Sequence, residues 1–152
     1  MRLVGIDPGA VSGAFAFLDT ATNTAFVGDV PVVDNNVNSS ELSRLLDLHN
    51  PDKVILERVS SMPGQGVSSS FSFGRGLGRI EGVVAASGLC VEYVTPQIWK
   101  RHFKLPGGPK NKELSRARAI QLFPDVTGLS LKKNSGRAEA LLIARWYAEK
   151  FA

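Results

Sequence analysis

The sequence predicts an α/β fold, a mixed β-sheet flanked by helices, in a single domain that spans residues 1–152. Two observations carry this prediction. The first third of the chain reads as consecutive strands separated by turn residues, and the remainder alternates between strands and helices, an order typical of α/β domains. A chain of 152 residues also fits one domain that buries about two thirds of its unfolded surface, enough for a continuous hydrophobic core.

Five segments have the composition of β-strands, because apolar residues fill them and turn residues bound them. They are residues 2–7, 12–18, 24–33, 53–57 and 89–94. The first three follow one another through short turns, which predicts an antiparallel meander. The segments 2–7, 53–57 and 89–94 are expected to be central, buried strands.

Helix signals fall between and after these strands. Asn38-Ser39-Ser40-Glu41 has the character of a helix start, and the helix it opens must end before Pro51. A loop of small residues at 60–70 precedes a helical run to Ala86, and Thr95-Pro96 begins another helix by pairing a capping residue with proline. Two more helices are predicted over residues 112–123 and about 136–151.

A stripe of glycines occupies the helical run that ends at Ala86. Gly74, Gly78 and Gly82 are spaced four residues apart, so they share one helix face. Each costs about 1 kcal/mol relative to alanine inside a helix. Such a stripe indicates close approach of another backbone, either within the subunit or from a second copy.

The charge of the chain is distributed unevenly. Residues 1–57 hold 3 Lys/Arg and 8 Asp/Glu, a net charge of −5, whereas residues 58–152 hold 15 and 6, a net charge of +9. A basic remainder beside an acidic first third favours a polyanionic partner, since clustered lysines and arginines bind phosphates. Ordinary surface charge is the alternative interpretation.

Cysteine content and hydropathy indicate a cytoplasmic protein. Cys90 is the single cysteine, and no Cys/His cluster has the spacing of zinc ligands. The N-terminus reaches an acidic residue at position 7, too early for the apolar core of a signal peptide, and no stretch of about 18 apolar residues occurs. We therefore expect no disulfide and no membrane partner.

Three carboxylates carry the candidate chemistry. Asp7 and Glu57 each end a strand expected to be buried, and Glu139 lies in a helix that is apolar nearly all round. A carboxylate in such a helix needs a partner. Hard oxygen ligands that converge from three elements are what Mg²⁺ or Mn²⁺ requires, and two-metal phosphodiester hydrolysis uses such ligands.

Three blocks containing these residues resemble the RuvC family of Holliday junction resolvases, which have an RNase H-like fold. The blocks are Gly5-Ile6-Asp7-Pro8-Gly9, Val54-Ile55-Leu56-Glu57 and Gly136-Arg137-Ala138-Glu139-Ala140-Leu141-Leu142-Ile143-Ala144. They occur in the family's order, and the resemblance spans residues 2–147. The compact length and the loop Met62-Pro63-Gly64-Gln65-Gly66 look more like the phage-type members.

The resemblance implies a Mg²⁺-dependent endodeoxyribonuclease that resolves four-way junctions or other branched DNA. It implies that Asp7 bridges two metal ions, with Glu57 and Glu139 as further ligands, and that a homodimer nicks two strands symmetrically. The expected location is then the cytoplasm of a bacterial cell or of a phage-infected host. The family usually places a fourth acidic residue or a histidine about one turn before the last carboxylate, where this chain offers Asn134 and Ser135.

Basic and aromatic side chains are candidate DNA contacts. The basic candidates are Arg75, Arg79, Lys100, Arg101, Lys104, Lys132 and Lys133. Lys133 or a neighbour is expected to offset charge in the transition state. Phe71 and Phe73 could stack on an unpaired base, although a buried core role is expected for at least one of them.

Two other functions fit the same residues. The neutral Asn134 and Ser135 favour a catalytically weak or silent module that binds junction DNA without cutting it. A related RNase H-like group that trims ribosomal RNA precursors also opens with a strand ending in Asp-Pro-Gly, so cleavage of structured RNA is a second alternative.

Overall fold

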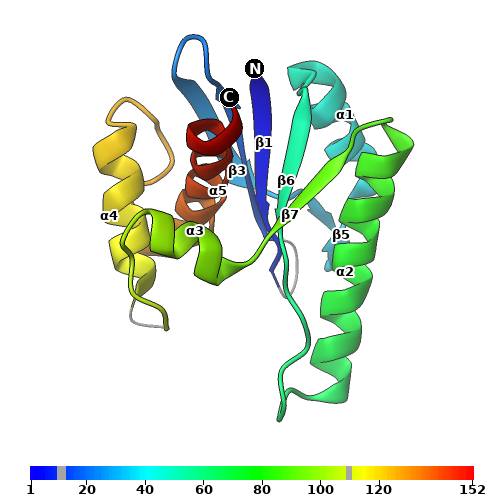
Figure 1. Cartoon of the computed structure of the whole chain (residues 1–152). Helices are drawn as coiled ribbons and strands as arrows, with labels where there is room; N and C mark the ends of the chain where they lie inside the picture. The colour runs from blue at the N-terminus through cyan, green and yellow to red at the C-terminus, as the bar shows by residue number, and fades with distance from the viewer. Residues whose placement is uncertain (10–12, 109–110) are drawn as a thin grey trace.

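A five-stranded mixed β-sheet forms the centre of the molecule (Figure 1). The computed structural model describes residues 1–9, 13–108 and 111–152. The strand order is β3-β2-β1-β6-β7. The strands are β1 (Arg2–Asp7), β2 (Ala14–Asp19), β3 (Thr24–Asp29), β6 (Lys53–Glu57) and β7 (Val91–Val94).

The pairing confirms the predicted meander and the mixed sheet. β1 pairs antiparallel with β2 and β2 with β3, whereas β6 runs parallel to both β1 and β7. One expectation is wrong: the segment expected to be a third central strand, β7, lies at the edge of the sheet. Residue 12, where the second strand was expected to begin, lies outside the described residues.

The predicted strand over residues 24–33 is divided. β3 ends at Asp29, and a separate two-stranded hairpin follows, formed by β4 (Val32–Val33) and β5 (Asn36–Val37). Pro31 between them has no N–H to donate to a ladder. Asp34 and Asn35 adopt left-handed conformations, with φ of 49° and 58°, which a tight hairpin turn requires.

The helices follow the sequence signals closely. Asn38 caps the first helix, because its Oδ1 accepts a hydrogen bond from the backbone N–H of Glu41 at 3.1 Å. Asn50, with φ of 43°, ends that helix just before Pro51. The helices are α1 (Ser39–His49), α2 (Val67–Ala86), α3 (Pro96–His102), α4 (Lys112–Leu122) and α5 (Ser135–Phe151).

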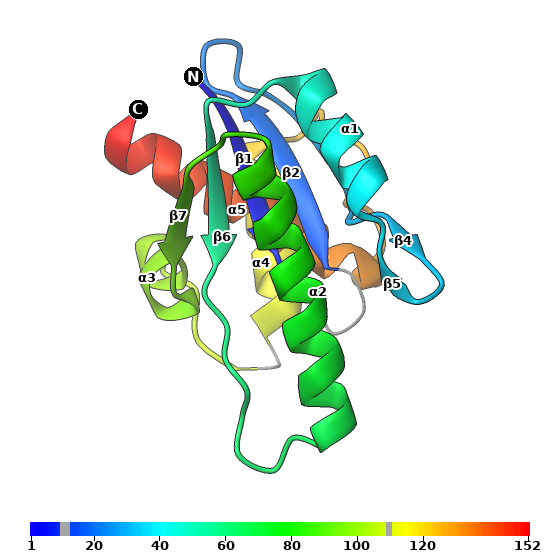
Figure 2. The ribbon, with the colours of Figure 1, turned by 90° about the vertical axis from the view of Figure 1, so that its right-hand side faces the viewer.

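Helices cover both faces of the sheet. In Figure 2, α1 and α2 lie in front of the strands, and α3, α4 and α5 lie behind them. Side chains alternate between the two faces along each strand. Accordingly, Leu3 and Ile55 join the core beneath α5, whereas Val4, Ile6 and Leu56 join the core beneath α1 and α2.

The close contact between α5 and β1 depends on Gly5. A Cβ atom at this position would overlap the carbonyl oxygen of Ala140 and lie 2.8 Å from the backbone nitrogen of Ala144. Because Gly5 has no side chain, α5 lies directly on the centre of the sheet. None of the helices in the described part of the chain is long and apolar enough to cross a membrane.

Candidate active site

Asp7 and Glu57 end neighbouring parallel strands at the same edge of the sheet. The register pairs Ile6 of β1 with Leu56 of β6, and each carboxylate is the next residue. By the alternation of side chains, both carboxylates face α5, as Leu3 and Ile55 do. Asp7 is half-buried and Glu57 is buried.

Glu139 adds a third carboxylate from α5. Its neighbours Ala138, Ala140 and Leu141 are fully buried, and Glu139 itself is only 8% exposed. The helix therefore places one charged side chain within an apolar surface, as the sequence predicts. Because α5 packs on β1 and β2, Glu139 comes to the strand edge that carries Asp7 and Glu57.

The charges of Glu57 and Glu139 both act on Asp7, so the three carboxylates form one electrostatic cluster. Burial raises the pKa of Asp7 well above its ordinary value of 3.8, and the negative charges of Glu57 and Glu139 raise it further. The positive charges of Lys100 and Lys112 act in the opposite direction. Burial also raises the pKa of Glu57. The cluster is thus an excess of negative charge that neighbouring lysines offset only in part.

Side chains of α3 and α4 hold two of the carboxylates. The indole Nε1 of Trp99 donates a hydrogen bond of 2.7 Å to Oε2 of Glu57, which lowers the pKa of that carboxyl group against the effect of burial. The Nζ of Lys100 lies 3.3 Å from Oε1 of Glu139, and the Oγ of Ser115 donates to the same oxygen at 3.2 Å.

The carboxylates do not form a closed metal-binding group in this conformation. Across residues 1–9, 13–108 and 111–152, no three His, Cys, Asp or Glu side chains are close enough together to hold an ion. Glu139 instead faces the ammonium group of Lys100. The donor set nevertheless fits a hard divalent cation, because it consists of three carboxylates whose mutual repulsion such a cation relieves.

The turn before Glu139 contributes no acidic side chain. Asn134 is buried beside the N-terminus of α5, and Ser135 is the first residue of that helix. Gly136 lies directly against Asp7: a Cβ atom there would be 3.5 Å from Oδ2 of Asp7 and 3.4 Å from Cβ of Ala14. Position 136 therefore joins 134 and 135 as a candidate position for a fourth ligand.

Three of the predicted DNA-binding residues line one cavity. Lys100, Arg101 and Lys104 face an open cavity of about 880 Å³ between α3 and residues 105–108. Lys100 also contacts Glu139, so this basic cavity borders the carboxylates.

Arg75 and Arg79 are bound within the subunit. Arg75 donates to the side chain of Asn36, and Arg79 donates to the carbonyl oxygen of Val37 at 3.0 Å. Both arginines of α2 therefore hold the β4–β5 hairpin in this structure.

Lys132 and Lys133 are exposed in a short 3₁₀ turn before α5. The hydrogen bond from Arg116 lowers the pKa of Glu113, and the charge of Lys132 adds to this effect. The hydrogen bond from Arg137 lowers the pKa of Asp29, and the charge of Lys133 adds to this effect. The lysines whose charges act on Asp7 are instead Lys100 and Lys112. Lys112 was not predicted as a site residue, although it is the last residue of a basic segment of the sequence, residues 104–112.

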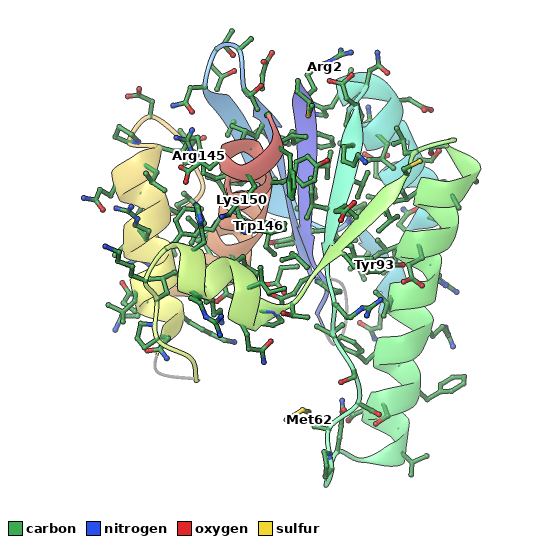
Figure 3. All side chains as sticks on the ribbon, viewed as in Figure 1. Arg2, Met62, Tyr93, Arg145, Trp146 and Lys150 are labelled. Atoms are coloured by element: carbon green, nitrogen blue, oxygen red, sulfur yellow. The ribbon has the colours of Figure 1, made fainter. Side chains whose placement is uncertain are left out.

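An apolar cavity lies beside the basic one. It has a volume of about 780 Å³ and shares Pro96 and Gln97 with the basic cavity. Its other lining residues include Arg58, Met62 and Phe73; Figure 3 shows Met62 on the loop that extends beyond β6. The expected core role for a phenylalanine here is wrong, because Phe71 is 67% exposed and Phe73 is half-buried.

Comparison with solved structures defines the fold class. The chain is similar to Thermus thermophilus RuvC in complex with a Holliday junction substrate, with a TM-score of 0.72 and 20% identity over 98% of this chain and 95% of that chain. A second Thermus thermophilus RuvC structure has a TM-score of 0.70 and 18% identity, with coverage of 98% and 96%. The predicted RNase H-like α/β fold is confirmed, and it is the fold of RuvC.

Two further relatives are resolvases of eukaryotic organelles. The yeast mitochondrial Holliday junction resolvase Ydc2 has a TM-score of 0.55 and 14% identity, covering 97% of this chain and 81% of that chain. The chloroplastic Holliday junction resolvase MOC1 of Chlamydomonas reinhardtii is 37% identical over 86 residues. That match covers 56% of this chain but only 10% of the length of the relative. No protein-family profile matches the chain.

Proposed function

We propose that this chain is a structure-selective endonuclease that resolves four-way DNA junctions by metal-dependent phosphodiester hydrolysis. The observation that carries the proposal is the convergence of Asp7, Glu57 and Glu139 at one strand edge of a RuvC fold. Ydc2 and MOC1 are Holliday junction resolvases, and the similar RuvC structure holds a Holliday junction substrate, which favours branched DNA as the substrate.

Asp7, Glu57 and Glu139 would hold Mg²⁺ or Mn²⁺, in two ions per site by the family resemblance. The bound metal supplies an activated water nucleophile and stabilises charge on the phosphate. Burial and the charges of Glu57 and Glu139 raise the pKa of Asp7 well above its ordinary value, so a cation would stabilise the ionised form of Asp7. Glu139 would bind the metal in place of its contact with Lys100, whose ammonium group would then be available to a phosphate.

The two adjoining cavities form the proposed DNA path. Lys100, Arg101 and Lys104 bind backbone phosphates in the basic cavity. The apolar cavity receives an unstacked base, with Phe73 as its aromatic wall. Lys112, whose charge reaches Asp7, adds a further cation near the carboxylates.

We also propose that the chain acts as a homodimer, because one site cannot nick two strands of a junction symmetrically. The contact surface is the glycine stripe of α2. An added Cβ atom at Gly74, Gly78 or Gly82 would meet nothing within 4 Å, so the stripe packs against no described part of its own subunit. Val67 and Phe71 of the same helix are also exposed.

Two alternatives are tested beside the main proposal. A silent junction-binding module is favoured by the absence of an acidic side chain at Asn134, Ser135 and Gly136. A nuclease for structured RNA is favoured by the Asp-Pro-Gly opening at residues 7–9.

The deciding experiment compares three labelled substrates: a four-way DNA junction, a linear duplex of the same sequence and a structured RNA. Each is incubated with the chain and Mg²⁺ or Mn²⁺, with EDTA and Asp7→Asn as controls. Paired nicks in the junction alone support the proposal. Binding without cutting by the unaltered chain supports the silent module, and preferential RNA cutting supports the third function.

Junction affinity should fall steeply with salt. Each neutralised phosphate contributes a slope of about −0.9 in log K against log salt, and the basic clusters suggest about three to six such contacts per subunit. Fluorescence anisotropy across a salt series measures the slope. An affinity that stays flat from low to moderate salt contradicts the basic DNA path.

A further inference from the structure

The indole of Trp99 makes a buried polar contact with the carboxylate cluster. Trp99 is 0% exposed, and its Nε1 donates a hydrogen bond of 2.7 Å to Oε2 of Glu57. The next residue of α3, Lys100, contacts Glu139. Two consecutive residues of one short helix therefore reach two of the three carboxylates.

The second tryptophan provides a comparison within the same core. Trp146 belongs to the same hydrophobic cluster as Trp99 and is 7% exposed. Its Nε1 is buried and has no hydrogen-bond partner within the described part of the chain. Figure 3 shows Trp146 on α5. Packing thus explains both indoles, but only Trp99 directs its N–H group to a carboxylate that is a candidate metal ligand.

A donor that fixes one carboxylate oxygen restricts the rotation of the whole carboxyl group. Glu57 lies at the end of a strand, and its side chain has three rotatable bonds that cost entropy when a ligand immobilises them. A partner that is itself fully buried cannot move with the carboxylate. The hydrogen bond therefore orders the Glu57 side chain during folding, so that binding of a cation does not have to supply this entropy.

We propose that Trp99 is a positioning residue for metal binding: its indole N–H holds Oε2 of Glu57 and presents Oε1 to the cation. This inference rests on the proposed function, because it needs Glu57 to be a metal ligand. It assigns to Trp99 a role beyond packing, and it assigns none to the N–H group of Trp146.

Matched substitutions test the proposal. Trp99→Phe and Trp146→Phe each remove an indole from the same core and retain an aromatic ring. Mn²⁺ binding to the DNA-free chain is measured by calorimetry, and thermal unfolding is followed for both variants. We expect Trp99→Phe to weaken Mn²⁺ binding by about tenfold or more, the usual effect of losing a partner that orients a ligand. Trp146→Phe should leave Mn²⁺ binding unchanged, whatever it does to stability.

A double-mutant cycle separates positioning from packing. In a Glu57→Gln background, Trp99→Phe should cause no further loss of Mn²⁺ affinity, because its effect acts through that carboxylate. If Trp99→Phe does not fold, Trp146→Phe still decides, since Trp99 is then its only tryptophan. Mn²⁺ should change the fluorescence of Trp99 in the Trp146→Phe variant, and adding Glu57→Gln to that variant should abolish the change.

The outcomes distinguish the inference from the proposed function. If the unaltered chain binds Mn²⁺ and Trp99→Phe binds it equally well, the positioning role is overturned and the metal site stands. The positioning role is also overturned if Trp99→Phe does not fold and the Trp99 fluorescence of Trp146→Phe stays constant while calorimetry shows that this variant binds Mn²⁺. If the unaltered chain binds no Mn²⁺, the proposed function and this inference both fall.

Discussion

The two long helices of the molecule are packed very differently. α5 has 17 residues, and nine of its side chains are buried, including Glu139. α2 has 20 residues, but only Ile80 and Val84 are buried. Figures 1 and 2 show the N-terminal part of α2 extending beyond the sheet, whereas α5 lies across the sheet.

This difference assigns separate roles to the two helices: α5 carries a carboxylate of the proposed active site, and α2 carries the proposed contact surface for a partner. α5 is fixed by small residues on both sides of its contact with β1, with Gly5 on the strand and Ala140 and Ala144 on the helix. Such packing can hold a catalytic carboxylate at a defined position. α2 has glycines and exposed apolar side chains instead, which cost stability in an isolated subunit and suit a surface that another molecule covers.

The largest expected effect is the loss of junction cleavage when Asp7, which faces α5, is changed. Asp7→Asn should reduce junction cleavage by at least about a thousandfold, equivalent to about 4 kcal/mol, because it removes the ligand expected to bridge the metals. Junction affinity should be unchanged or higher, since one charge that repels phosphates is lost. Gel-shift and nicking assays on the same preparation measure both. Affinity that collapses with activity would show that Asp7 is structural, and Glu57→Gln should behave like Asp7→Asn.

The second prediction compares a glycine beneath α5 with a glycine on α2. Gly5→Ala should destabilise the fold by about 3 kcal/mol, because the new Cβ atom overlaps the backbone of Ala140. In the separated subunit, Gly78→Ala should instead stabilise the helix by up to about 1 kcal/mol, because no other part of the described subunit lies within 4 Å of a Cβ atom at position 78. At concentrations low enough to keep the chain monomeric, thermal unfolding of the two variants should therefore shift in opposite directions.

Gly78→Leu extends this comparison to assembly. The larger side chain should leave the subunit folded and dissociate the proposed dimer, as measured by light scattering and circular dichroism. Unfolding of this variant would mean that the stripe packs within the subunit. A chain that is already monomeric at micromolar concentration and still makes paired nicks would contradict the dimer.

Much of this contrast could be predicted from the sequence. The apolar surroundings of Glu139 indicate burial, and the strand ends at Asp7 and Glu57 indicate a shared edge, because both properties follow from local periodicity. The stripe of α2 was also visible, but its environment was not. Whether a glycine faces another backbone or open space depends on tertiary packing that spacing alone does not encode.

The side chains around the carboxylates could not be predicted in the same way. The contacts of Trp99 and Ser115 join segments distant in the sequence, and no motif marks them. The same holds for Arg79, whose spacing suggests a DNA contact but which bonds to the β4–β5 hairpin. The position of β7 at the sheet edge likewise depends on strand order, which composition does not determine.

The third prediction concerns the start of α5, where residues 134–136 include no acidic side chain. With three carboxylates only, a second metal ion should bind weakly, so cutting should need more metal or favour Mn²⁺ over Mg²⁺. Asn134→Asp, Ser135→Asp and Gly136→Asp, made separately, should identify the ligand position: one of them should raise the rate at low Mg²⁺ by about tenfold. If none does and the unaltered chain cuts well at low Mg²⁺, three carboxylates suffice.

The smallest effect contrasts two carboxylates near the start of α5. Asp29 accepts two hydrogen bonds from Arg137, at 2.8 Å each, and these lower its pKa below the ordinary 3.8. Burial and the charge of Glu57 raise the pKa of Asp7 above the same value. A lowered pKa contributes stability that is present above the unfolded value and is lost as pH falls through the folded value; a raised pKa opposes folding by an amount that grows as pH rises from the unfolded to the folded value and is constant above it. In EDTA at about pH 8, Asp7→Asn should therefore raise Tm and Asp29→Asn should lower it; the Asp7 difference should shrink as pH falls toward about 4, whereas the Asp29 difference should shrink only below that pH. A fall in Tm for Asp7→Asn at the higher pH would mean that Lys100 and Lys112 already neutralise the cluster, and that a metal ion has little repulsion left to relieve.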